Sequence, residues 1–140
     1  MKILRAEEVT LPARFLTTSA HLIATLTILF ALNETAALAK GSSGDQQKAK
    51  QTLAGLAWTA VACFAVEFVG LFTGISIFFT TANCFYIFCH FVGTILVALF
   101  VGEHWSIDTY IYFFVLFNAL PCIVELLIAF CVLRLRLTEY

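Results

Sequence analysis

Four apolar runs, each long enough to cross a lipid bilayer as a helix, occupy most of this 140-residue chain. Their approximate limits are residues 15–32, 53–74, 83–101 and 110–133. The first run would extend about 27 Å at the helical rise per residue, close to the thickness of the hydrocarbon core. The runs are continuously apolar rather than alternating, which argues against the strands of a membrane barrel. The sequence therefore predicts an all-α integral membrane protein, a four-helix bundle forming one domain over residues 1–140.

The composition excludes several other classes of protein. The chain is 61% hydrophobic and 12% charged, against roughly 45–50% and about 25% in soluble domains. A net charge of −1 and the lack of a basic stripe argue against a nucleic-acid partner. The five cysteines include no CxxC pair, so neither a disulfide framework nor a zinc site is expected. We expect a protein in contact with the lipid bilayer that has no cofactor, no bound metal and no soluble small-molecule substrate.

Basic residues set the expected orientation. Four spans place both termini on one side, and the lysines and arginines near the spans divide between that side (Lys2, Arg5, Arg14, Arg134 and Arg136) and the other (Lys40, Lys48 and Lys50). This excess predicts cytoplasmic termini. The residues expected at the membrane–water interfaces are Arg14, Trp58, Glu103, Trp105 and Tyr110. The polar stretch from residue 33 to residue 52 has the composition of a loop.

A cleaved signal peptide is the alternative for the first run. Basic residues precede it, and Ala37-Leu38-Ala39 resembles a cleavage site. The apolar stretch exceeds the usual 7–15 residues of a signal core, which favours a retained span. Loss of an N-terminal tag from the mature protein would contradict four spans.

Each span carries one ionisable residue in its interior: His21, Glu67, His90 and Glu125. Counted from the span ends facing the termini, all four lie about 9–12 Å deep, so alternating helices bring them to one level. An acid at the centre of a membrane helix costs at least ~2.5 kcal/mol, so an ionisable residue inside a span needs a partner or a purpose. We interpret the four residues as a hydrogen-bonded polar layer that fixes helix register. A site for an ion, a proton or a lipid headgroup, and contact with a partner's helix, are the alternatives.

Two further features concern helix packing. Gly70 and Gly74 form a GxxxG motif, which permits close approach of helices within the bundle or between two copies. Pro121 lies inside the fourth run, removes the hydrogen bond to the carbonyl of Phe117 and should kink that helix. Asn118 is placed to satisfy a freed backbone group.

The chain shows no pattern of catalytic residues. There is no nucleophile–base pair, phosphate-binding loop or pair of carboxylates. Glu103, His104 and Asp108 cluster in a short connection that we interpret as a solvated loop. The sequence thus favours a non-enzymatic protein, with a small transporter, a channel-like protein or a lipid-binding protein using the Glu/His layer as the alternative.

An ordered set of short motifs resembles one family. The motifs are Pro12-Ala13-Arg14-Phe15-Leu16 with His21; Phe64-Ala65-Val66-Glu67 with Gly70 and Gly74; His90; Glu103 and Trp105 with Thr109-Tyr110; and Ala119-Leu120-Pro121 with Glu125. Together they resemble the transmembrane protein 107 family over nearly the whole chain. The 33–52 stretch does not match.

This resemblance implies a four-span protein of the ciliary membrane at the transition zone, with cytoplasmic termini. It implies a role as a scaffold that recruits membrane partners of the Meckel syndrome module. It also implies support for cilium assembly and for the diffusion gate that controls entry of ciliary membrane proteins.

Overall fold

The computed structural model describes residues 6–39 and 46–138, which form helices joined by short connections. In chain order the elements are α1 (Ala6–Phe30), α2 (Leu32–Leu38), α3 (Gln46–Phe72), α4 (Thr80–Glu103), α5 (Ile107–Phe114), the π-helix η1 (Val115–Ala119) and α6 (Leu120–Thr138). The segments long and apolar enough to cross a membrane are Val9–Phe30, Gln46–Phe72, Thr80–Glu103 and Ile107–Leu135. Over the described residues, these segments confirm the prediction of an all-α fold with four helices long and apolar enough to cross a membrane.

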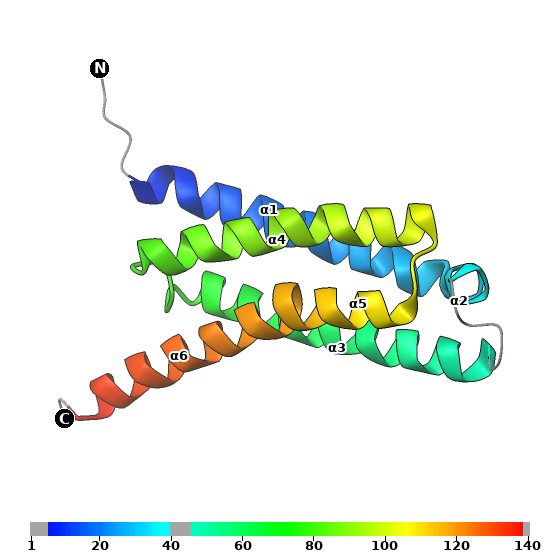
Figure 1. Ribbon diagram of the computed structural model, residues 1–140. Helices are drawn as coiled ribbons and strands as arrows, with labels where there is room; N and C mark the ends of the chain where they lie inside the picture. The colour runs from blue at the N-terminus through cyan, green and yellow to red at the C-terminus, as the bar shows by residue number, and fades with distance from the viewer. Residues whose placement is uncertain (1–5, 40–45, 139–140) are drawn as a thin grey trace, which may run out of the picture.

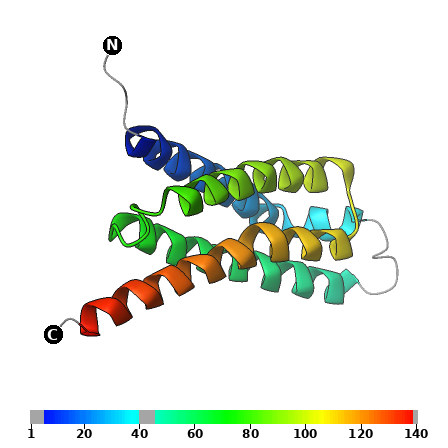
Figure 2. The same ribbon diagram turned by 60° about the vertical axis from the view of Figure 1, so that its left-hand side comes forward.

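The four long segments pack as a bundle. α1 lies along α4, while α3 lies beside the continuous segment from α5 to α6 (Figure 1). Successive segments run in opposite directions, so the outer ends of α1 and α6 lie at the same end of the bundle in both views (Figure 2). The short α2 lies at the opposite end, where it packs on α3.

Most buried positions of the long helices α1, α3 and α4 recur at spacings of three and four residues. In α1 they are Arg14, Thr18, His21, Thr25 and Ile28; in α4 they include Asn83, Tyr86, His90, Gly93, Val97 and Phe100. This spacing places the side chains on one face of a helix that packs at a shallow angle against its neighbours. The remaining faces carry exposed apolar side chains, as lipid contact requires.

The interior of the bundle is divided along its length. One half is an apolar core near α2, built around Ile28, Leu53, Ala57, Val97 and Phe100. The other half, nearer the outer ends of α1 and α6, contains most of the buried charged and polar side chains. The same helix faces therefore change from apolar to polar along the bundle.

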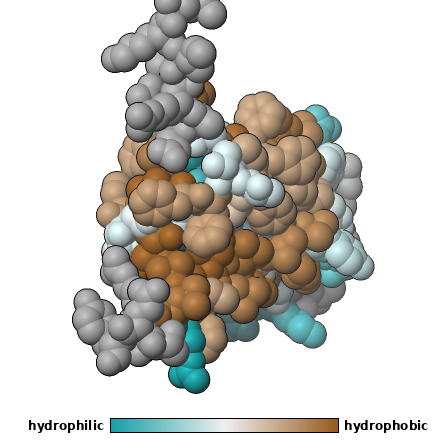
Figure 3. Space-filling view, turned by 90° about the vertical axis from the view of Figure 1, so that its left-hand side faces the viewer, coloured by the Kyte–Doolittle hydropathy of each residue, from teal (hydrophilic) through white to brown (hydrophobic). Residues whose placement is uncertain are grey.

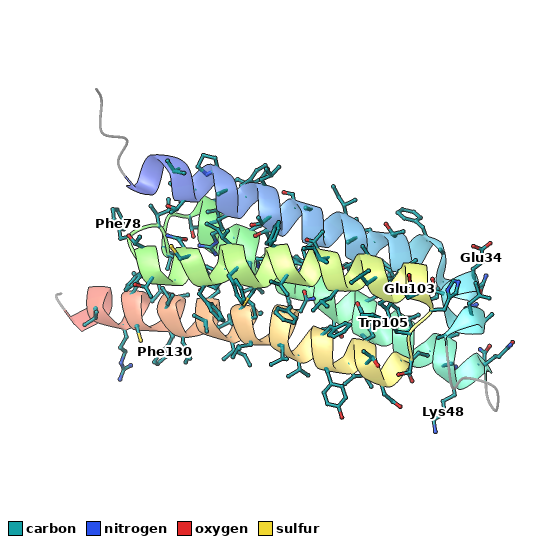
Figure 4. All side chains as sticks on the ribbon, turned by 45° about the horizontal axis from the view of Figure 1, so that its top comes forward. Glu34, Lys48, Phe78, Glu103, Trp105 and Phe130 are labelled. Carbon is teal, nitrogen blue, oxygen red and sulfur yellow. The ribbon has the colours of Figure 1, made fainter. Side chains whose placement is uncertain are left out.

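The stretch predicted as a loop is partly helical. α2 covers residues 32–38 and α3 begins at Gln46, several residues before the expected span. Gln46–Lys50 contains good helix formers, so the helix continues beyond the apolar run. The Gly-Ser-rich residues 40–45 lie outside the described part of the chain. Glu34, Lys48, Glu103 and Trp105 gather at this end of the bundle, opposite Phe78 (Figure 4).

Pro121 follows a π-helix in the fourth membrane-crossing segment. The N–H of Leu120 donates to the carbonyl of Val115, the five-residue spacing of a π-turn. The segment bends there, so that the axis of α6 points in a different direction from the axis of α5 (Figure 1). A kink in this segment was predicted, and the π-turn is the way in which the backbone accommodates the missing proline N–H.

The connection between α3 and α4 is apolar and lies at the same end as the diverging α6. Figure 3 looks onto this end and shows mostly hydrophobic colours between the grey segments. A groove of about 650 Å³ opens here, lined mainly by Phe78, Phe79, Phe85 and Val124. The divergence of α6 from α4 leaves this side of the bundle open.

Candidate functional site: a buried polar network

Arg14 is the centre of the first group of buried polar side chains. Its guanidinium donates to Ser76 Oγ at 2.8 Å, Asn83 Oδ1 at 2.9 Å and Glu125 Oε2 at 3.0 Å. The guanidinium carbon also lies 4.0 Å from the centre of the Tyr86 ring, a cation–π contact. We call these five residues the arginine cluster. It joins α1 to the α3–α4 connection, α4 and α6.

Asn83 holds the connection in place for this arginine. Its Nδ2 donates to the backbone carbonyls of Ser76 and Ile77, at 3.3 and 3.0 Å. These bonds fix the orientation of the amide and leave Oδ1 facing Arg14 as an acceptor. A planar guanidinium has five donors in a fixed geometry, and here they reach acceptors from three elements.

A second group of polar side chains lies about two helical turns further into the bundle. His90 Nε2 is 2.5 Å from Glu67 Oε2, and His90 Nδ1 is 3.1 Å from His21 Nδ1. Phe64 packs edge-on against His21, with ring centres 5.0 Å apart. We call His21, Glu67 and His90 the histidine cluster. All three side chains are almost wholly buried.

Two glycines make room for these groups. A Cβ atom on Gly70 would overlap the carboxylate of Glu125, and one on Gly93 would overlap the imidazole of His21. Glu125 therefore lies against the backbone of α3, one turn from Glu67, and His21 lies against the backbone of α4. The close packing of the two clusters depends on the missing side chains at these positions.

The four predicted layer residues all point into the bundle interior, but they do not form one bonded set. His21, Glu67 and His90 form a hydrogen-bonded chain. Glu125 instead forms an ion pair with Arg14. Its carboxylate lies against the backbone of Gly70, on the same helix as Glu67. The arrangement is two adjacent clusters rather than a single layer.

The two glycines of the GxxxG motif lie in different conformations. α3 ends at Phe72, and Gly74 has a φ of +76°, a left-handed conformation that terminates the helix. Only Gly70 packs against another helix. Asn118 is buried, and within the described residues its Oδ1 accepts no hydrogen bond. The group freed by Pro121 is a carbonyl, which would need the Nδ2 of Asn118 as donor, so the predicted role of Asn118 stays a prediction.

The residues predicted at the interfaces differ in their surroundings. Trp58 and Glu103 are exposed, and Trp105 is half-buried against the apolar core. Tyr110 is buried and packs on Phe100, with ring centres 4.9 Å apart. Arg14 is 1% exposed, so its assignment to the interface missed its partners inside the bundle.

Sequence analysis did not predict Ser76, Asn83 and Tyr86 as members of the network. A signal was present in the spacing: Arg14 lies seven residues before His21, and Asn83 lies seven before His90. Seven residues are close to two helical turns, so each pair shares one face. No comparable pattern marks Ser76, which lies in a connection.

The contacts of the network join helices to one another. Each carboxylate bonds to a protein group through its Oε2, while Oε1 of Glu67 and of Glu125 is buried without a hydrogen-bond partner among the described residues. In the same part of the chain no group of three or more His, Cys, Asp or Glu side chains is arranged to hold a metal ion. Interhelical polar contacts of this kind supply association energy where the hydrophobic effect between helices is absent.

Comparisons with known proteins place the chain in a family. The family model described as "TMEM107: Transmembrane protein" matches residues 10–129. "Transmembrane protein 107" from Homo sapiens is 32% identical over 129 residues, which cover 89% of this chain and 91% of the relative. The proteins of the same name from Mus musculus and Danio rerio are each 30% identical, over 89% and 82% of this chain and 91% and 87% of theirs. No solved structure matches.

The matched region includes all the residues of both clusters. It also includes nearly all of the first span and most of the fourth. The chain is an integral multi-pass membrane protein that belongs to the transmembrane protein 107 family.

Proposed function

We propose that this protein is a non-enzymatic scaffold subunit of the ciliary transition zone. In this role it recruits or anchors membrane proteins of the Meckel syndrome module. It thereby supports cilium assembly and the diffusion gate for ciliary membrane proteins. Membership of the transmembrane protein 107 family supports this proposal.

The observation that best supports the scaffold role is that the charged and polar side chains of the two clusters point into the bundle. The ion pair between Arg14 and Glu125 and the contact between His90 and Glu67 are internal to the bundle. These contacts join the helices to one another, while apolar side chains such as Phe88 and Phe130 face outward. A bundle joined in this way offers a stable apolar surface to neighbouring helices in the membrane.

The transporter or channel alternative requires the same acids to contact a moving ion. Glu67 and Glu125 each bond to a neighbouring side chain and are almost wholly buried. The lipid-binding alternative would instead use the apolar groove beside Phe85 and Val124. Ion flux through proteoliposomes that is abolished by Glu67→Gln or Glu125→Gln, with partner binding intact, would overturn the scaffold role.

We also propose that both termini face the cytoplasm. Arg14 is buried, so the support comes from basic residues nearer the ends of the chain, Lys2, Arg5, Arg134 and Arg136, against Lys40, Lys48 and Lys50 on the opposite side. Lys2, Arg5 and Lys40 lie outside the described residues. A glycosylation acceptor inserted near residue 42 should be modified, and one fused to either terminus should not.

Localisation tests the scaffold role directly. A tagged copy expressed in ciliated cells should concentrate at the base of the cilium, and its purification should recover other transition-zone membrane proteins. A variant at an outward position, Phe130→Ala, should remain folded and report whether α6 contacts a partner, with Phe88→Ala as the control on α4. Uniform distribution over cell membranes without ciliary partners would contradict the proposal.

A further inference from the structure

The buried polar half of the bundle has an uneven charge count. Among the described residues, the buried arginine, glutamate and histidine side chains in this half are Arg14, Glu67, Glu125, His21 and His90. Arg14 offsets the charge of Glu125 through their ion pair. With neutral imidazoles, an ionised Glu67 would leave the interior with an uncompensated negative charge. A buried charge without a counterion is strongly unfavourable even after the protein relaxes around it.

Within the part of the chain that the structure describes, the groups around Glu67 include no second cation. The titratable side chains that face it or its partners are Arg14 and His21 from α1, Cys63 from α3, Tyr86, Cys89 and His90 from α4, and Cys122 and Glu125 from α6. Arg14 is already bonded to Glu125. The side chain that bonds Glu67 and can carry positive charge is therefore His90.

The hydrogen-bonded chain has a place for one additional proton. Without it, His90 Nε2–H donates to the Glu67 carboxylate, and His90 Nδ1 accepts from His21 Nδ1–H. With it, His90 carries a hydrogen on both ring nitrogens and shares its Nε2 proton with Glu67. His90 Nδ1–H then donates to His21 Nδ1, and the single hydrogen of the neutral His21 ring lies on its Nε2. The observed distances of 2.5 and 3.1 Å serve both arrangements, so the proton is accommodated by hydrogen shifts alone.

We propose that the histidine cluster is a proton-binding site that retains one proton between Glu67 and His90 at neutral pH. The bound proton makes the polar half of the bundle electrically neutral. Phe64 and the backbone at Gly93 enclose His21, so the chain of hydrogen bonds ends inside the bundle. The proton is a structural component of the packed helices, and this inference does not depend on the ciliary role.

Spectroscopy of the full chain in nanodiscs of neutral phosphatidylcholine at pH 7 tests the proposal. With ¹⁵N-labelled histidine, we expect an imidazolium signal from His90, or a protonated carboxyl band in the infrared that Glu67→Gln removes. His104, the third histidine, is exposed and serves as the internal control. Neutral imidazoles at both His21 and His90, together with ionised carboxylates, would overturn the proposal.

The pH dependence of stability gives a second test. A proton bound in the folded bundle and released on unfolding makes stability fall as pH rises. The melting temperature of the wild-type protein should fall as the pH is raised from neutral to alkaline. The melting temperature of the Glu67→Gln variant should fall less, because the glutamine amide donates to His90 and does not ionise. The matched control Glu103→Gln, at an exposed position, should follow wild type.

Parallel alkaline losses in wild type and a folded Glu67→Gln variant would contradict proton binding. A monovalent cation in place of the proton has a separate signature. Exchange of choline chloride for sodium chloride should leave the melting temperature of wild type unchanged. A sodium-dependent rise that is abolished by Glu67→Gln would show that a metal cation holds the position, and the proton proposal would be wrong.

Discussion

Arg14 and Glu125 are 111 positions apart in the chain, and their side chains form an ion pair of 3.0 Å inside the bundle. The pair joins the first membrane-crossing helix to the last. Both side chains are almost fully buried, and Ser76, Asn83 and Tyr86 surround the guanidinium. The ion pair links α1 to α6 in the half of the bundle where α6 diverges.

Removal of one member of this pair should strongly destabilise the bundle. Glu125→Ala leaves a buried guanidinium without its countercharge, and we expect a loss of about 3–5 kcal/mol in the free energy of unfolding. Unfolding by sodium dodecyl sulfate in mixed micelles, followed by circular dichroism, measures the loss. Glu103→Ala removes an exposed acid and should change stability little.

The double variant Arg14→Ala/Glu125→Ala separates the pair from its surroundings. It removes both charges, so its loss should be smaller than the sum of the two single losses. Additive losses would show that Arg14 and Glu125 contribute independently. That result would contradict the role assigned to the ion pair.

Gly70→Ala should destabilise the contact between α3 and α6. The added methyl group overlaps the Glu125 carboxylate, which must move away from Arg14 or push the helices apart. We expect a loss of about 1–3 kcal/mol, typical of overpacking. Gly55→Ala, on the same helix and facing open space, should be neutral or slightly stabilising in the same unfolding assay. Equal effects of the two substitutions would contradict the close approach of Glu125 to the α3 backbone.

Gly93→Ala should disturb the histidine cluster while leaving the arginine cluster in place. The methyl group overlaps the imidazole of His21 and displaces it from His90. The ¹⁵N signals of His21 and His90 should shift, and that of His104 should stay unchanged. Gly102→Ala on the same helix meets no atom within 4 Å and should leave all three signals in place.

Thiol reactivity should follow the burial of the cysteines. Cys84 and Cys131 are exposed, whereas Cys89 and Cys122 are buried. In variants that retain one cysteine each, N-ethylmaleimide should label the two exposed thiols in detergent several-fold faster than the two buried ones. Rapid labelling of Cys89 in a folded sample would be inconsistent with the packing of α4.

The helix count was predictable because the length of an apolar run is a local property of the sequence. The extent of the helices was not, since hydropathy reports immersion in lipid rather than helicity. The segment beginning at Gln46 is therefore helical and polar at once. The residue at which α3 ends was also not predictable from hydropathy. Gly74 belongs to the same apolar run as Gly70 but adopts a left-handed conformation.

The network was only partly predictable for a different reason. Each buried acid and histidine stood out in its span, so His21, Glu67, His90 and Glu125 were identified singly. Their bonding depends on helix rotation and on groups as distant as Arg14 and Ser76, which are 62 positions apart. A rotation of one helix by a single residue position, about 100°, exchanges one set of partners for another.

The long separation between Arg14 and Glu125 has a consequence for biosynthesis. The first span enters the bilayer before the ribosome has made the acid that will neutralise its arginine. Until α6 arrives, Arg14 has the neutral acceptors Ser76 and Asn83 within reach but lacks the countercharge of Glu125. A buried charge without its partner is costly, so we expect the three-span chain to pack less tightly than the complete bundle. A chain truncated ahead of Glu125 should then be exposed to membrane quality control.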